Sequence, residues 1–435
     1  MRFIVKRFIS QAEGALTVLG LFLFMACCVI GGLALDVANA YMVRTQLQAT
    51  ADAAAHAALY NRDTMTEAEA IVEAMSVVGT MLPAAKYGNT IEASDIQFGT
   101  WDTSTEVFSP VSGSKEAVYV ASERATTSGN AVGTFFLRMA GVNHWDIRRG
   151  TVAIRYLNPC TSEGFIGQGV VDMQSNNTFE DGFCIHSNTH VEVNNGNSFG
   201  DDVVVSMPDK RDLVMPTDGF ASNPGLQNAL RDGAYNLRVL NTLPSIYADL
   251  ELGGTTHGPS YITSPLVVNM TDRSNLTMAD FTSGRVHKIN CSGNQTLSFK
   301  ANETFSDIVI VTDCRVSFGQ GNVFGNVVLI TSSTDAQSLK AASGLSIGVD
   351  DNCATGGGSQ FITFGGAEFA ANLEMHGGQL LALGDVEFAA RADGINGASI
   401  ISGGEIDGTS NATMGFCAGS GMEGNFESSY FRIAF

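Results

Sequence analysis

The feature that most constrains this chain is an uncharged apolar run near its N-terminus, from Ala15 to Leu35. The run has 21 residues, and a helix of that length spans about 30 Å, the thickness of the hydrocarbon core of a bilayer. Apolar residues surround the helix on all sides, which favours lipid as their environment. We therefore predict a membrane anchor that includes Ala15, Leu19, Phe22, Val29 and Leu35.

The flanking charges predict the orientation of this anchor. Three basic residues lie within the first seven positions, and Asp36 follows the run. Because positive charge stays on the cytoplasmic side of a membrane, we expect a cytoplasmic tail at residues 1–13 and the remainder of the chain on the other side. A cleaved signal peptide is the alternative, with Ala38–Ala40 as its cleavage site, although such peptides have a shorter apolar region.

Charge and cysteine content limit the partners and the chemistry. The 435 residues carry a formal net charge of −20, which argues against nucleic acid because its phosphates would be repelled. Six of the eight cysteines lie beyond the apolar run without metal-ligand CxxC spacing, so disulfides are favoured over zinc. Fifteen connectivities are open, and the simplest joins sequence neighbours: Cys160–Cys184, Cys291–Cys314 and Cys353–Cys417.

The first helix is expected to continue beyond the membrane, over residues 14–60 in all. Helix-forming residues dominate its outer half, and apolar residues recur there at helical spacing. Thr66 to Glu69 match a capping box, which predicts a second helix to about Val78. Strands are then expected near 96–101, 106–108, 117–121 and 150–156, with a helix-like segment at 132–139. Residues 61–157 are thus predicted to form a small α+β head with a pilin-like plan.

The composition changes from Cys160 onward, where Gly, Asn, Asp, Ser and Thr become more frequent and the strands become shorter. The best-defined strands begin roughly 19 residues apart, and a repeat of about 20 residues with several short strands is typical of a parallel β-solenoid. A β-sandwich is the alternative. We predict an α+β protein whose mainly β domain covers residues 158–435, interrupted by an insertion at about 207–265 with a helix-like stretch at 226–247.

Several N-terminal motifs together resemble a known family. They are Glu13-Gly14-Ala15, Gly32 to Ala38, Arg44 to Gln48, Ala51 to Ala55, Phe98 to Asp102, Phe108, Ala117 to Val120 and Thr151 to Ala153. This pattern resembles the TadG-like proteins of the Flp (Tad, tight adherence) pilus-assembly family, over about the first third of the chain. The resemblance implies a bacterial inner-membrane anchor, a periplasmic or extracellular head, a part in pilus assembly and adhesion, and no catalysis. Pilin-type members carry a Glu for prepilin cleavage where this chain has Leu19, so the resemblance does not extend to that processing.

The outer half of the first helix is expected to dock on partner subunits. The predicted docking residues are Asp36, Leu47, Ala51, Asp52, Ala54 and Ala55. Packing of the alanine stripe within this same chain is an open alternative. The expected partners are other pilus-assembly or minor pilin subunits, the lipid bilayer, and a glycan or other surface ligand.

No motif predicts catalysis or a cofactor. The two G-x-S-x-G matches, around Ser198 and Ser346, lack the strand before and helix after the serine that a nucleophile elbow needs. We therefore expect a non-enzymatic envelope protein. The alternative is a membrane-tethered β-helix that binds or cleaves polysaccharide, which for hydrolysis would need paired carboxylates facing one groove.

Overall fold

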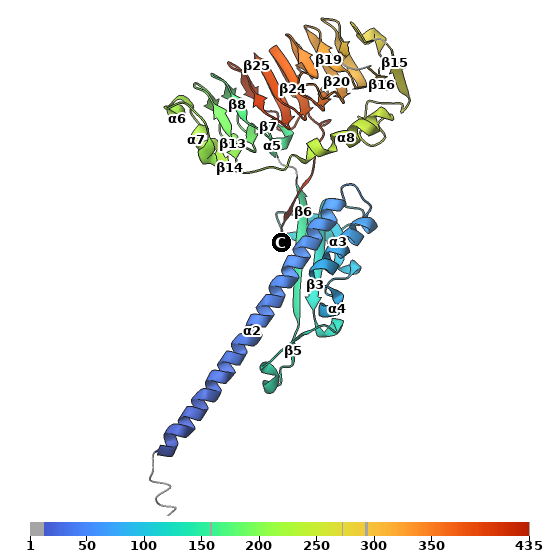
Figure 1. Ribbon diagram of the computed structural model, residues 1–435. Helices are drawn as coiled ribbons and strands as arrows, with labels where there is room; N and C mark the ends of the chain where they lie inside the picture. Colours follow the sequence, from blue (N-terminus) through green and yellow to red (C-terminus); the bar gives the residue numbers. More distant parts are fainter. Residues whose placement is uncertain (1–12, 157–158, 272, 292–294, 435) are drawn as a thin grey trace, which may run out of the picture. The chain divides into compact units, whose positions relative to one another are not determined.

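The computed structural model describes residues 13–156, 159–271, 273–291 and 295–434, which form two compact units (Figure 1). The N-terminal unit contains the chain up to Tyr156 and again from Ser429, and the β unit contains Leu157–Ser428. Residues 1–12 of the expected cytoplasmic tail lie outside the described residues, as does the side chain of Ala15.

One long helix, α2 (Glu13–Asn61), dominates the N-terminal unit. Its 49 residues correspond to about 70 Å of unbroken helix. The predicted capping box opens α3 (Glu67–Met81): the Thr66 side chain accepts from the Glu69 N–H, and the Glu69 carboxylate accepts from the Thr66 N–H at 2.9 Å. The short helices of this unit are α4 (Ala84–Tyr87), η1 (Ala93–Asp95), η2 (Thr126–Ser128) and η3 (Leu137–Ala140).

An antiparallel sheet packs against α2 and α3. Its strands, in spatial order, are β2 (Val107–Pro110), β1 (Ile96–Asp102), β3 (Ala117–Arg124), β6 (Ile147–Tyr156) and β28 (Tyr430–Ile433). Alternate residues such as Phe98, Val118 and Ala153 face the helices and join the core of this unit. The first four strands match the expected ones within a few residues.

The expected helix-like segment at 132–139 is wrong. Its beginning is β4 (Val132–Gly133), which pairs antiparallel with β5 (His144–Trp145), and only η3 near its end is helical. Three large apolar residues between β4 and β5 do not face a core: Phe135, Phe136 and Met139 are all exposed. The apolar content of residues 132–139 therefore does not reflect a regular helix.

The C-terminal boundary of the β domain also differs from the prediction of 158–435. Residues of β28 pair with β6, with Tyr430 opposite Tyr156, and so belong to the N-terminal unit. The ring of Phe431 in this strand lies 6.0 Å from that of Tyr60 on α2. The β unit is therefore inserted between two neighbouring strands of one sheet.

The β unit contains a large parallel sheet, which confirms the mainly β prediction for this region. Every pairing described in this sheet is parallel. Its first strands are β7 (Gly164–Gly167), β8 (Val171–Met173), β9 (Thr178–Phe179), β10 (Cys184–Ser187), β11 (Val191–Val193), β12 (Ser198–Phe199), β13 (Val204–Met207) and β14 (Leu230–Asp232). The others are β15 (Val267–Met270), β16 (Arg285–Ile289), β17 (Thr296–Ser298), β18 (Thr304–Thr312), β19 (Arg315–Phe318), β20 (Asn322–Thr331), β21 (Leu339–Ala341), β22 (Leu345–Ile347), β23 (Gln360–Thr363), β24 (Ala367–Ala382), β25 (Val386–Ser402), β26 (Ile406–Asp407) and β27 (Thr413–Gly415).

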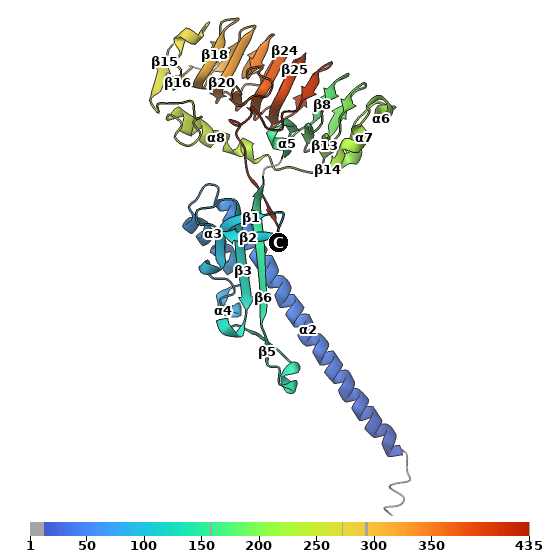
Figure 2. The ribbon, with the colours of Figure 1, turned by 180° about the vertical axis from the view of Figure 1, so that it is seen from behind.

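The order of strands in this sheet is not the order of the chain. The chain enters at β7 and proceeds through β10 and β13 to β14 at one end. It then crosses to β15 at the opposite end and returns strand by strand to β25, which pairs with the other side of β7 through Ser399 and Gly164 (Figures 1 and 2). The first strand of the β unit, β7, and the late strand β25 therefore lie side by side in the middle of its sheet.

The crossing segment contains α6 (Gly219–Ser222), α7 (Leu226–Ala229) and α8 (Arg238–Glu251), besides the 3₁₀ turn η4 (Lys210–Asp212); η5 (Met278–Asp280) follows β15. Helix α8 packs on one face of the parallel sheet, whereas the buried residues of α7 join the main core. The predicted helix at 226–247 is thus divided, because Leu230 to Asp232 form β14 beside β13. Leu243 of α8 and Val309 of β18 belong to one buried cluster, whereas the neighbouring Ile310 belongs to the main core on the opposite face of the strand.

Candidate functional site

The N-terminal half of α2 exposes its apolar side chains. Among the described residues, α2 is long and apolar enough to cross a membrane, which is compatible with a single-pass anchor. The predicted anchor residues Leu19, Phe22, Val29 and Leu35 are all exposed, with Phe22 66% accessible. Isolated apolar residues are common on protein surfaces, but a continuous exposed stretch of this kind marks a surface that contacts something else.

The outer half of α2 buries most of the residues that we expected to dock. Leu47, Ala51, Ala54 and Ala55 are fully inaccessible. The alanines pack against Ala74 of α3 and the helix-facing side of the sheet, because their small side chains allow close approach. The docking prediction is therefore wrong for these four residues, and the alternative of packing within the chain is the one observed.

Asp36 and Asp52, the two acids of the predicted set, also make contacts within the chain. The Asp36 carboxylate is almost inaccessible and accepts three backbone N–H groups, from Phe135 at 2.6 Å, Phe136 at 2.9 Å and Leu137 at 2.7 Å. Asp52 accepts a hydrogen bond of 2.8 Å from the Gln48 side chain one turn earlier. Asp36 therefore fixes the segment before η3 onto the end of the apolar run.

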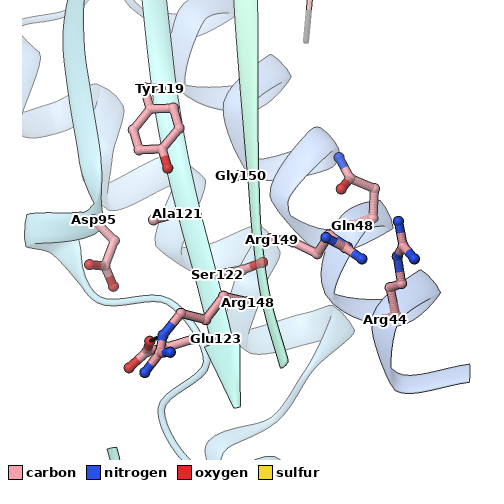
Figure 3. Close-up of a pocket in the computed structure, with 10 residues that line it drawn as sticks. All are labelled: Arg44, Gln48, Asp95, Tyr119, Ala121, Ser122, Glu123, Arg148, Arg149 and Gly150. Atoms are coloured by element: carbon pink, nitrogen blue, oxygen red, sulfur yellow. Dashed lines mark hydrogen bonds and ion pairs between the residues drawn. The ribbon is translucent and has the colours of Figure 1, made fainter. Parts of the chain in front are cut away.

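A polar recess lies beside the outer half of α2 (Figure 3). It has a volume of about 560 Å³ and is lined by Arg44 and Gln48 of α2 and by residues of the sheet that include Tyr119 and Arg149. Figure 3 shows Arg149 extending toward the side where Gln48 and Arg44 lie. Sequence reasoning named Arg44, Gln48 and Tyr119 only as parts of a family pattern. It missed Arg149, which comes from a strand more than 100 positions after α2 residues Arg44 and Gln48.

The acids of the recess already have partners. Glu123 receives a 2.7 Å ion pair from Arg148, and hydrogen bonds from Ser128 and Arg148 lower the pKa of Glu123. Asp95 accepts the Glu92 N–H at 2.8 Å. Within the described part of the chain, by contrast, no ion pair or side-chain hydrogen bond is found for Arg44 or Arg149. The recess therefore presents two cations that an incoming carboxylate could reach.

The cysteines of the β unit form the three pairs expected between sequence neighbours. The structure joins Cys160 to Cys184, Cys291 to Cys314 and Cys353 to Cys417. Among the described residues one group with close potential metal ligands was found, Cys291, Asp313 and Cys314. Because its two thiols are joined in a disulfide, this group does not offer thiolates to a metal ion.

Acidic side chains form a column across the β unit. Five carboxylates stand opposite one another on successive parallel strands, in the order Glu192, Asp172, Asp407, Glu387 and Glu368. Neighbouring strands lie about 4.8 Å apart, so these groups repel one another. Burial, followed by the charges of Asp407 and Glu192, raises the pKa of Asp172. The column could not be predicted from the sequence, because its members are distant in the chain.

Comparison with known proteins separates the two units. Residues 164–418 match the family described as Domain of unknown function (DUF7867), which covers more than half of the chain. Residues 14–68 match the family described as Flp pilus-assembly TadE/G-like, which confirms the resemblance of the N-terminal part. No curated protein and no solved structure matches the chain. The chain therefore belongs to the DUF7867 family, and it carries a TadE/G-like pilus-assembly domain at its N-terminus.

Proposed function

We propose that this protein is an inner-membrane-anchored component of a bacterial Tad pilus system that acts through protein–protein contacts. Its N-terminus is cytoplasmic, and its bulk is periplasmic or extracellular. The observation that carries the proposal is the division of the TadE/G-like segment: its first half exposes apolar residues, and its second half contributes Arg44 and Gln48 to a polar recess.

The recess is the proposed docking site for another pilus-assembly or minor pilin subunit. Arg44 and Arg149 are cations without ion pairs among the described residues, in a chain whose net charge is −20. A carboxylate of a partner would gain charge-assisted hydrogen bonds from both guanidinium groups. The buried alanines support this role indirectly, because they hold α2 against the sheet that supplies Arg149.

A double charge reversal, Arg44→Glu with Arg149→Glu, tests the proposal. The variant is expected to lose most of its co-purification with other pilus components from detergent-solubilised membranes, and pilus number on the cells should fall. The matched control is Lys86→Glu, an exposed cation of α4 in the same unit. Partner yields that are unchanged in the double variant would contradict docking at the recess.

For the β unit we propose a parallel β-helix that presents flat polar faces for surface adhesion, and for the N-terminal unit a pilin-like head. Pairing of β7 with β10 and of β10 with β13 advances the chain by 20 residues per step, as successive turns of a solenoid would. The proposed protein has no catalytic activity. Its β unit instead supplies an extended surface for a glycan or protein ligand.

The acidic column favours one alternative, a β-helix that binds or cleaves polysaccharide. A carboxyl with a raised pKa beside ionised carboxylates is an arrangement that glycoside hydrolases use. The test is the release of reducing ends from a panel of neutral and acidic polysaccharides by the purified full chain. Activity that is lost in Asp172→Asn would establish the alternative, and no release by the unaltered protein would favour the non-enzymatic role.

A further inference from the structure

The segment between β4 and β5 exposes an unusual set of apolar side chains. Met139 is 86% accessible and Phe135 59%, with Phe136 and Val142 also exposed. Burial of such residues away from water is favourable, and four of them close together in one short loop form a patch rather than scattered surface residues. We call residues 134–142 the apolar loop.

The apolar loop lies directly against the end of the apolar run of α2. The Phe136 ring packs on the backbone of Gly32, where an added Cβ would come within 2.5 Å of the ring. The three hydrogen bonds to Asp36 hold the backbone of the loop in this place. A groove of about 710 Å³ continues between helix and loop, lined by residues that include Leu35 and Met139. The exposed patch is thus continuous with the surface that is proposed to face lipid.

The depth and charge of the loop fit the headgroup region of a bilayer. Gly32 precedes Asp36 by four residues, which places the Phe136 ring about 6 Å inside the end of the apolar run. Interfacial elements bury their apolar faces about 5–10 Å into this boundary. Arg138 is the one charged residue of the apolar loop, and its long side chain can extend to lipid phosphates.

We propose that the apolar loop inserts into the outer-leaflet interface and makes a second membrane contact beside α2. Its partner is the lipid bilayer itself, and the inference rests on the proposed anchoring of α2 in a membrane. Two contacts, one a spanning helix and the other a shallow loop joined to it through Asp36, would limit rotation and tilt of the N-terminal unit relative to the membrane surface. Trp145, half-buried in β5 next to the loop, is of the residue type that is enriched at this depth.

Fluorescence quenching in the full chain tests the insertion. Both natural tryptophans are replaced, as Trp101→Phe and Trp145→Phe, and a single tryptophan is introduced as Met139→Trp. Met139 is suited to this because its exposed side chain supports no packing in the unit. The protein is reconstituted into vesicles of phosphatidylethanolamine and phosphatidylglycerol that carry bromine at shallow or deep positions of the acyl chains.

Two matched variants complete the design. Phe24→Trp reports the anchor, since position 24 lies within the apolar run. Val111→Trp reports an exposed apolar position at the opposite end of α2. Val111 lies near Gly113, whose carbonyl accepts a hydrogen bond from Arg62, the residue after the end of α2. The expected result is a blue-shifted emission of Met139→Trp with several-fold stronger quenching than Val111→Trp, greatest for shallow bromines, while Phe24→Trp is quenched most by deep bromines.

The outcomes separate this inference from the proposed anchor. If Phe24→Trp is quenched but Met139→Trp behaves like Val111→Trp, the loop does not enter lipid, and a protein partner or a second copy of the chain is the better occupant of the patch. If Phe24→Trp is not quenched either, the membrane anchor itself is overturned together with the loop. Phe135→Trp, at the loop's second most exposed large apolar side chain, repeats the measurement with an independent probe.

Discussion

Asp36 shows how one side chain joins the apolar run of α2 to the rest of the N-terminal unit. The sequence predicted that Asp36 follows the end of a membrane-spanning segment. It could not predict that the same carboxylate accepts hydrogen bonds from Phe135, Phe136 and Leu137, about a hundred positions later. Such a contact depends on tertiary structure and leaves no local signal in the chain.

Replacing this carboxylate should free the backbone of the apolar loop. In Asp36→Ala the three N–H groups lose an ionised acceptor, and each such hydrogen bond contributes about 1.5–3 kcal/mol. The amides of Phe135, Phe136 and Leu137 are expected to exchange with deuterium roughly 10-fold faster or more, as measured by mass spectrometry. The control is Asp102→Ala, whose carboxylate accepts from the Ser104 N–H in a remote turn and should leave these amides unchanged. Equal exchange in Asp36→Ala and the parent would contradict the assigned role.

The alanines of α2 are a second case in which residue type was read correctly and role was not. Their spacing predicted close approach of another element, and the structure identifies that element as α3 with the sheet of the same unit. Sequence alone cannot distinguish an internal neighbour from a separate subunit, because both require small side chains on one helix face.

Ala54→Leu should consequently destabilise the N-terminal unit rather than remove a partner. The fully buried site has no room for three further carbon atoms, and overpacking of this kind costs about 1–3 kcal/mol. Thermal unfolding in detergent is the measurement. The matched control is Ala49→Leu on the exposed face of the same helix, which should change the midpoint little. A midpoint as high as that of the parent would mean that the site repacks without strain.

At the scale of elements, local signals were informative and long-range pairing was not. The capping box at Thr66 and the strand patterns of β1, β3 and β6 are local, and the structure has each of them. The acidic column is different, since Asp172 lies between Glu192 and Asp407 only because β8 pairs with β11 on one side and β26 on the other. No spacing in the chain encodes that arrangement.

The column makes the stability of the β unit depend on pH in a defined direction. The folded pKa of Asp172 is raised by burial and by its acidic neighbours, so the unfolded chain loses this proton at lower pH than the folded one. The contribution of Asp172 to stability is therefore complete below about pH 4, the unfolded pKa of Asp, and is lost as pH rises through the folded pKa. Once ionised, the Asp172 carboxylate opposes folding.

Asp172→Asn should accordingly raise the midpoint of thermal unfolding of the β unit at pH 7, by roughly 1–3 °C. The difference from the parent should vanish below about pH 4, where the aspartate is protonated in both states. Asp209→Asn is the control and should lower the midpoint at pH 7, because hydrogen bonds from Arg211 lower the pKa of Asp209 to about 2. A lower midpoint of Asp172→Asn at pH 7 would mean that the Asp172 carboxylate makes a favourable contact that outweighs the repulsion.

For the whole molecule, the decisive feature is the insertion of one unit into a sheet of the other. The sequence predicted two regions with different composition, but it assigned the final residues to the β domain, since a single short strand carries no sign of its partner. The chain leaves the N-terminal sheet at Tyr156 and re-enters it at Tyr430, directly opposite. The β unit has a similar arrangement at its own ends, because its first strand β7 and its late strand β25 are also neighbours.

Excision of the β unit should therefore leave a folded N-terminal unit. We would replace residues 157–429 by a short Asn-Gly turn, which suits adjacent antiparallel strands, so that β6 continues directly into β28. The expected protein retains cooperative unfolding and membrane localisation and still supports pilus assembly, while surface adhesion is lost.

The control removes residues 160–435 and with them β28, so that the core-facing ring of Phe431 no longer covers α2. That truncated chain should unfold at lower temperature than the excised one. If both deletions unfold alike, β28 contributes nothing to the N-terminal unit; if the excised chain adheres as well as the parent, adhesion does not reside in the β unit.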